Sequence, residues 1–220
     1  MKTVKTEELI QQLAGQPGPV HRLAAPWQRA VLWLAVSAAY ASLFVLFSHL
    51  DFSSWSMTDK RYVIELVATA ATGVAAAIVA FCSVIPGYDR KWLWFPIVPL
   101  AIWLATLSEG CVHDWLQFGR DALALRTDWD CLESGAVIGI IPAIVIVFML
   151  RRGAPLVPHA SLALAAVAVA ALSSFVMRLH HYSDASIIIL VWHLGSVLLV
   201  AAMASAFGSR LLKWRHLRTA

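Results

Sequence analysis

The chain has 220 residues, of which 60% are hydrophobic and only 14% are charged, and its formal net charge is +4. Several stretches of about twenty residues carry no charge, which excludes a soluble globular domain and predicts an integral membrane protein. Three cysteines are too few for a disulfide scaffold. The basic residues flank the apolar stretches, so the positive charge does not indicate direct binding of nucleic acid.

Residues 1–29 are polar and form the predicted cytoplasmic head. No signal peptide opens the chain, so we expect this head to remain on the mature protein. Thr6 is a suitable N-cap, acidic residues follow it in the first turn, and Gly15 is a suitable stop. This pattern predicts a short helix over 6–14, followed by a linker rich in proline.

Leu9, Ile10 and Leu13 share one face of this predicted helix. A helix this short is marginal alone in water, so its apolar face needs a surface to pack against. Two interpretations stay open: the face rests on the membrane or on cytoplasmic loops, or it docks a soluble partner. The candidate partner-binding residues are Leu9, Ile10, Leu13, Val20 and Leu23.

Six apolar segments follow the head, and each can cross about 30 Å of hydrocarbon as a helix. We expect these spans at 30–50, 62–85, 92–110, 132–150, 160–179 and 186–208. The predicted fold is therefore an all-α integral membrane bundle of six transmembrane helices over 30–208, followed by a basic cytoplasmic tail over 209–220. The connections are short except for 111–131. Prolines at 96, 99 and 142 are expected to kink spans three and four.

The basic residues are divided unequally between the two sides of this bundle. The N-terminus, the turns at 86–91 and 151–159, and the C-terminus hold 12 of the 17 Lys and Arg residues. By the positive-inside rule, we expect both termini of this multi-pass membrane protein to lie in the cytoplasm. Ionisable residues are rare in the middle of the predicted spans, which disfavours an ion-coupled transporter or a haem-carrying bundle.

The predicted outer side gathers thiols, imidazoles and carboxylates that suit zinc or a similar divalent metal. The metal candidates are Cys111, His113, Cys131, His180, His181, Asp184 and His193. Cys111 and Cys131, at the two ends of the long connection, are also redox candidates. No recognised metal-ligand spacing is present, so three interpretations stay open: solvated loop residues, a metal site or a pair of redox thiols.

Several segments together resemble the negative-regulator-of-sigma-F (NrsF) family of bacterial inner-membrane anti-sigma factors. They are "PVHRLAAPWQRAVLW", "YVIELVATAATG", "WFPIVPLAIW", "CLESGAVIGIIPAIVIVFMLRRGAP" and "LHHYSDASIIILVWH". The resemblance covers nearly the whole chain. It implies six spans, no enzymatic activity, and a cytoplasmic portion that holds an extracytoplasmic-function sigma factor and releases it under stress.

The resemblance also implies a pair of outer cysteines. Cys131 matches the family's cysteine before span four, but His181 occupies the position of the second. A histidine can bind a metal but cannot form a disulfide, and Cys111 could serve as the thiol partner instead. We therefore expect an anti-sigma factor that senses metal or redox stress at the periplasmic face. The alternative is a small metal or small-molecule membrane carrier or a redox subunit.

Overall fold

The computed structural model describes residues 6–15, 23–47, 60–119, 129–153 and 157–180, together with five single helical positions at 195, 199, 202, 203 and 206. Regular structure in these ranges is entirely helical. The elements are α1 (Thr6–Ala14), α2 (Pro26–Phe47), α3 (Lys60–Cys82), the 3₁₀ helix η2 (Arg90–Trp94), α4 (Ile97–Phe118), α5 (Trp129–Arg151) and α6 (Pro158–His180). The all-α prediction is confirmed.

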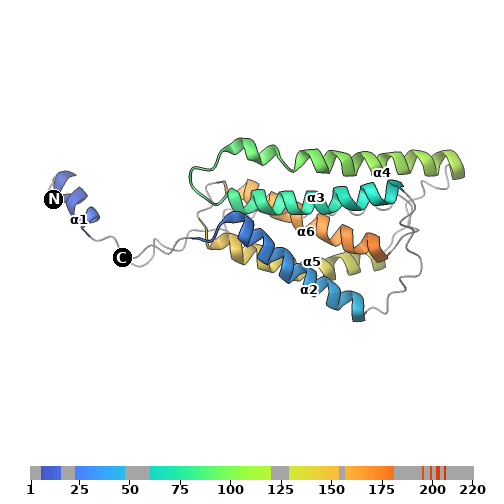
Figure 1. The fold of residues 1–220 in the computed structure, drawn as a ribbon, viewed down its shortest axis with the longest axis horizontal. Helices are drawn as coiled ribbons and strands as arrows, with labels where there is room; N and C mark the ends of the chain where they lie inside the picture. The colour runs from blue at the N-terminus through green and yellow to red at the C-terminus, as the bar shows by residue number, and fades with distance from the viewer. Residues whose placement is uncertain are drawn as a thin grey trace.

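Five of these segments are long and apolar enough to cross a membrane. They correspond to the first five predicted spans, with η2 and α4 together forming the third. The helices α2 to α6 run alternately in opposite directions and pack side by side (Figure 1). The predicted sixth span, 186–208, lies outside the described residues except for those single helical positions.

The helices α3 and α6 form the centre of the bundle and are the most buried of the five. Their small residues let the two backbones approach closely, because a Cβ added at Gly73 would lie 3.4 Å from the Cβ of Ala171. The hydroxyls of Thr69 and Thr72 donate to the carbonyls four residues earlier at 2.7 Å, which satisfies these polar groups within α3. These two helices, which are rich in small residues, therefore lie inside the bundle.

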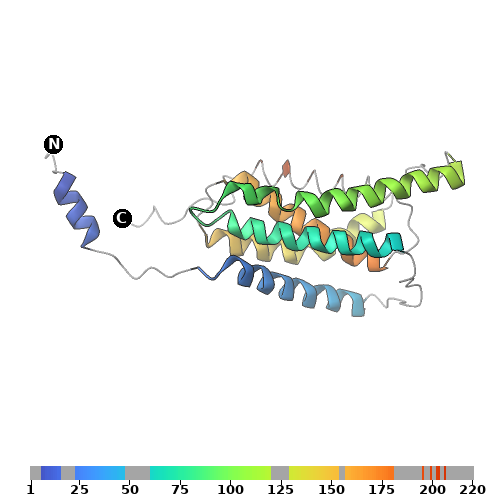
Figure 2. The same cartoon turned by 45° about the horizontal axis from the view of Figure 1, so that its top comes forward.

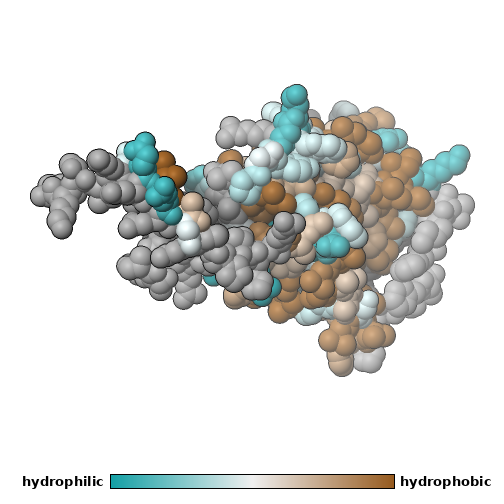
Figure 3. Space-filling view, turned by 60° about the vertical axis from the view of Figure 1, so that its left-hand side comes forward, coloured by the Kyte–Doolittle hydropathy of each residue, from teal (hydrophilic) through white to brown (hydrophobic). Residues whose placement is uncertain are grey.

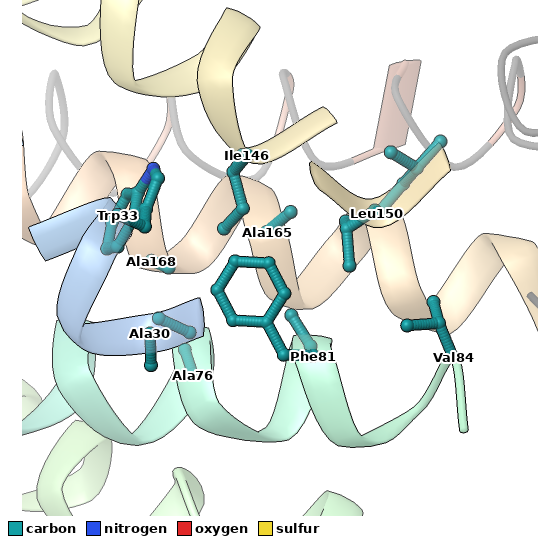
Figure 4. Close-up of a cluster of buried hydrophobic side chains, with 12 residues drawn as sticks. Ala30, Trp33, Ala76, Phe81, Val84, Ile146, Leu150, Ala165 and Ala168 are labelled. Carbon is teal, nitrogen blue, oxygen red and sulfur yellow. The ribbon is translucent and has the colours of Figure 1, made fainter. Parts of the chain in front are cut away.

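The main apolar core lies where α2, α3, α5 and α6 meet, near one end of the bundle (Figure 4). Trp33 and Phe81 are its largest side chains, and neither has any exposed surface. The indole Nε1 of Trp33 donates to the carbonyl of Pro142 at 2.9 Å, so α2 is tied to α5 by a hydrogen bond as well as by packing. By contrast, many large apolar side chains are exposed on the bundle, as lipid-facing helices require, and the face in Figure 3 shows part of this brown surface.

The predicted third span, 92–110, started correctly within one residue but ended too early, because the candidate span is Lys91–Gln117. The helix α4 begins after Pro96 and continues to Phe118, where Gly119 follows with a positive φ of 67°. Pro96 is the N-cap residue and Pro99 lies in the first turn, where a proline costs no hydrogen bond. These two prolines therefore lie at the break between η2 and α4 within the third candidate span, and Pro142 lies inside a helix, α5.

The extension of α4 also shortens the predicted outer connection. In both views the end of α4 projects beyond its neighbours (Figures 1 and 2). The segment between Phe118 and Trp129 is the connection that remains, in place of 111–131. Glu109, expected at the end of a span, lies nine residues before the end of α4. The segment "CVHDWLQF" (111–118) contains no Gly or Pro that would stop a helix. The next glycine in the chain is Gly119, directly after it.

Candidate functional site

The predicted head helix exists with the expected bounds, Thr6–Ala14. The N–H of Gly15 donates to the carbonyl of Gln11 at 2.9 Å and closes its last turn. Ile10 is 59% exposed and Leu23, just before α2, is 43% exposed. The side chains of Leu9 and Leu13, and all of Val20, lie outside what the structure describes. The head thus carries exposed apolar side chains at the described positions of the predicted docking surface.

The predicted outer cluster is only partly described. Cys111 is half-buried and His113 is exposed, and both lie on the last turns of α4, not in a loop as predicted. The backbones of Cys131 and His180 lie at the start of α5 and the end of α6, without described side chains. His181, Asp184 and His193 lie outside the described residues. Within the described part of the chain, no group of three or more His, Cys, Asp or Glu could hold a metal ion.

A buried ion pair joins α3 to α6 at the end of the bundle where Lys60 and His180 lie. Nη2 of Arg178 donates to Oε2 of Glu65 at 3.2 Å, and Nε of Arg178 lies 3.1 Å from Oε1 of Glu65. The two side chains are only 10% and 5% exposed. The guanidinium therefore lies within ion-pair distance of one carboxylate oxygen and donates a hydrogen bond to the other.

Tyr62 completes this group. Its ring lies beneath the guanidinium of Arg178, 5.4 Å from ring centre to Cζ, and its hydroxyl donates to the backbone carbonyl of Arg178 at 3.3 Å. That carbonyl belongs to the last turn of α6, which ends at His180. One turn of α3 thus neutralises the charge of Arg178, stacks on it and satisfies its backbone. We call Tyr62, Glu65 and Arg178 the ion-pair group.

A second buried arginine lies at the other end of the bundle. Arg29, in the first turn of α2, is 5% exposed. Its Nη2 donates to the carbonyl of Met149 in the last turn of α5, and its Cζ lies 4.8 Å from the ring centre of Phe81 on α3. The partial negative charge at the ends of α3 and α5 favours a cation here. Arg29 therefore fastens the start of α2 to the ends of two other helices.

Basic side chains gather at this end. They come from the start of α2 (Arg29), from the segment between α3 and α4 (Lys91) and from the end of α5 with the turn that follows it (Arg151 and Arg152). We call this end of the bundle the basic end. The chain enters α2 here directly from the head. The ion-pair group lies at the opposite end, so α3 extends from one buried arginine to the other.

A comparison with protein families gives a match to the family described as "Negative regulator of sigma F", over residues 13–214. This range includes all five candidate membrane spans. The chain belongs to this family. Like its NrsF relatives it is a negative regulator of a sigma factor, and its five candidate spans fit a multi-pass membrane protein. No curated protein and no solved structure matched the chain.

The structure gives physical reasons for two segments that carry the NrsF resemblance. In "RRGAP", a Cβ at Gly153 would lie 2.6 Å from Cγ2 of Val84, so only glycine lets the α5–α6 turn contact the end of α3. Beside this contact, the hydroxyls of Ser83 and Ser161 hydrogen-bond at 2.7 Å. In "YVIELVATAATG", Tyr62 and Glu65 provide the α3 half of the ion-pair group.

The pairing of Glu65 with Arg178 was not predicted from the sequence. A signal was present in the helical spacing of α3. Glu65 shares a face with Thr69, Thr72 and Ala76, and all four are buried. A carboxylate on the small-residue face of a membrane helix needs a buried cation, and Arg178 is a base within the predicted span 160–179.

Proposed function

We propose that this NrsF protein holds an extracytoplasmic-function sigma factor at the cytoplasmic face of a bacterial inner membrane and releases it under stress. The observation that carries the proposal is the family match over 13–214, on a bundle with five candidate spans. The basic end faces the cytoplasm under the positive-inside rule. With the sixth span at 186–208, both termini are then cytoplasmic and the ion-pair group lies toward the periplasm.

The head is the part of the chain that binds the sigma factor in this proposal. Its support is the exposed Ile10 on an amphipathic α1, and the exposed Leu23 before α2. The family match begins at Leu13, so nearly all of α1 precedes it. We infer that α1 adapts the head to one particular sigma factor, and that the linker and bundle carry what the family shares.

Purification of the detergent-solubilised chain, with mass spectrometry of the proteins that come with it, tests the function. A sigma factor should co-purify, and deletion of the chain should switch on that factor's promoters. The docking surface is tested by Leu9→Ala with Ile10→Ala, which should weaken binding by a factor of about 30 to 1,000 if the two are anchors. Gln11→Ala, on the exposed polar side of α1, is the matched control.

Two results would contradict these proposals separately. If no sigma factor co-purifies and deletion changes no sigma-dependent promoter, the function is wrong. If the factor binds the double variant as tightly as it binds the wild type, the function stands but α1 is not the docking surface.

We also propose that the signal reaches the end opposite the head, through a metal or a thiol oxidation at Cys111, Cys131 and the histidines near them. The support is chemical: these thiols and imidazoles are suitable ligands, and Cys111 and His113 both lie in the last turns of α4. Metal content of the purified protein, compared with Cys131→Ser and His181→Ala, tests the metal form. Non-reducing electrophoresis of wild type and Cys111→Ser after oxidant treatment tests the thiol form.

A further inference from the structure

The ion-pair group has a position that suits a switch. Arg178 lies two residues before the end of α6, so its long side chain can reach water from the membrane end if it leaves Glu65. Glu65 lies more than a turn inside α3 and is 4% exposed, so it depends on a cation within reach. An open form of the pair can therefore be described, in which Arg178 leaves Glu65 for water and α6 is displaced from α3.

A displacement of α3 at this pair would also move the part of α3 at the other end of the bundle. Glu65 and Phe81 are sixteen residues apart on one helix, a distance of about 24 Å along its axis. Phe81 lies beneath Arg29, which joins the start of α2 to the end of α5. Arg29 is also where the chain passes from the head into the bundle. The two buried arginines are thus linked by a single helix.

We propose that the pair of Glu65 and Arg178 is a latch that keeps the protein in its sigma-holding state. When the latch opens, α3 shifts against α6, the contact of Phe81 with Arg29 changes, and the head releases its partner. The inference rests on the proposed function, and it adds the element that couples the outer end of the bundle to the head. A coupling of this kind requires two packings of similar energy, and in this proposal they are the packings with the pair closed and open.

The test uses full-length protein in cells that carry a sigma-dependent reporter, with membrane levels measured by immunoblot. Glu65→Gln and Arg178→Gln should each raise the unstressed reporter by a factor between about 5 and 150, the range of ordinary allosteric coupling, at unchanged membrane level. The exchange of the two residues, Glu65→Arg with Arg178→Glu, should restore repression at least in part. Glu133→Gln and Lys60→Gln remove exposed charges at the same end and should leave the reporter unchanged.

Each remaining outcome decides against the latch. Single variants at normal membrane level that repress fully and respond normally to stress would show that the pair has no regulatory role. Variants absent from the membrane, including the exchanged pair, would show a role in folding alone. The wild type is the reference for the function itself: if it neither represses nor binds a sigma factor, the proposed function fails before the latch is tested.

Discussion

At the scale of single residues, close packing at the basic end depends on Gly153. A methyl group there would lie 2.6 Å from Cγ2 and 2.7 Å from Cβ of Val84, with the carbonyl of Val84 at 3.1 Å. Backbone and branched side chain both surround the site, so neither can move aside easily. This contact joins the α5–α6 turn to the segment that follows α3.

We predict that Gly153→Ala destabilises the protein by about 1–3 kcal/mol, the usual cost of overpacking. Thermal unfolding in detergent measures it. Gly135→Ala is the matched control, because nothing lies within 4 Å of a Cβ added there. Adding Val84→Ala to the Gly153 variant should recover part of the loss. Equal melting temperatures for the variants at 153 and 135 would contradict the contact.

The hydrogen bond from Trp33 to Pro142 gives a second prediction. Trp33→Phe keeps most of the buried ring but removes the indole N–H that donates at 2.9 Å. We expect a loss of roughly 0.5–1 kcal/mol, because interhelical hydrogen bonds in membranes are modest. Trp94→Phe, at a side chain that is 71% exposed, should change the melting temperature little. A larger effect at 94 than at 33 would argue against this bond.

At the scale of helices, the pairing of α3 with α6 depends on a small residue at position 73, where the chain has Gly73. The nearest atoms to an added Cβ lie at 3.4 to 3.7 Å, which is ordinary contact. Gly73→Ala should therefore be tolerated and Gly73→Leu should force the helices apart, at a cost of about 1–3 kcal/mol or more. Melting temperature and membrane level measure the difference. If Leu is tolerated as well as Ala, the close approach of α3 and α6 is wrong.

The positions of the helices could be predicted from the sequence much better than their ends and contacts. Long apolar runs fix where a chain crosses a membrane, because hydrocarbon tolerates no other backbone there. The start of α4 was missed because Pro96 and Pro99 suit a helix N-terminus as well as a kink. Its end was missed because "CVHDWLQF" is polar enough to suggest a loop yet contains no helix stop.

The ion-pair group and the Arg29 contacts could not be predicted from the sequence, because each joins residues that are far apart along the chain. Glu65 and Arg178 are 113 positions apart, and the contact of Arg29 with Met149 spans 120. Spacing along one helix can show that Glu65 faces inward, but it cannot name the helix that faces it. The head differs, since its nine-residue helix follows from local capping alone, and it was predicted with the correct bounds.

At the scale of the whole molecule, the two ends of the bundle should lie on opposite sides of the membrane. We predict that Gln117→Cys, in a background without other cysteines, reacts with an impermeant maleimide in intact spheroplasts. Asp89→Cys, in the turn after α3, should react only after permeabilisation. Both positions are exposed in the structure, so access to the reagent decides the result. The reverse pattern would place the head and its partner outside the cell.

The separation of Glu65 from Arg178 also bears on how the protein is made. Because synthesis adds about 5–20 residues each second, Glu65 precedes its partner by roughly 6 to 23 seconds. During this interval α3 carries a carboxylate whose cation has not been made, a costly group in lipid. Chains that end before α6 should therefore be recognised as incomplete and degraded. A pulse-chase comparison of chains ending at 153 and at 180 measures this, and the longer chain should persist.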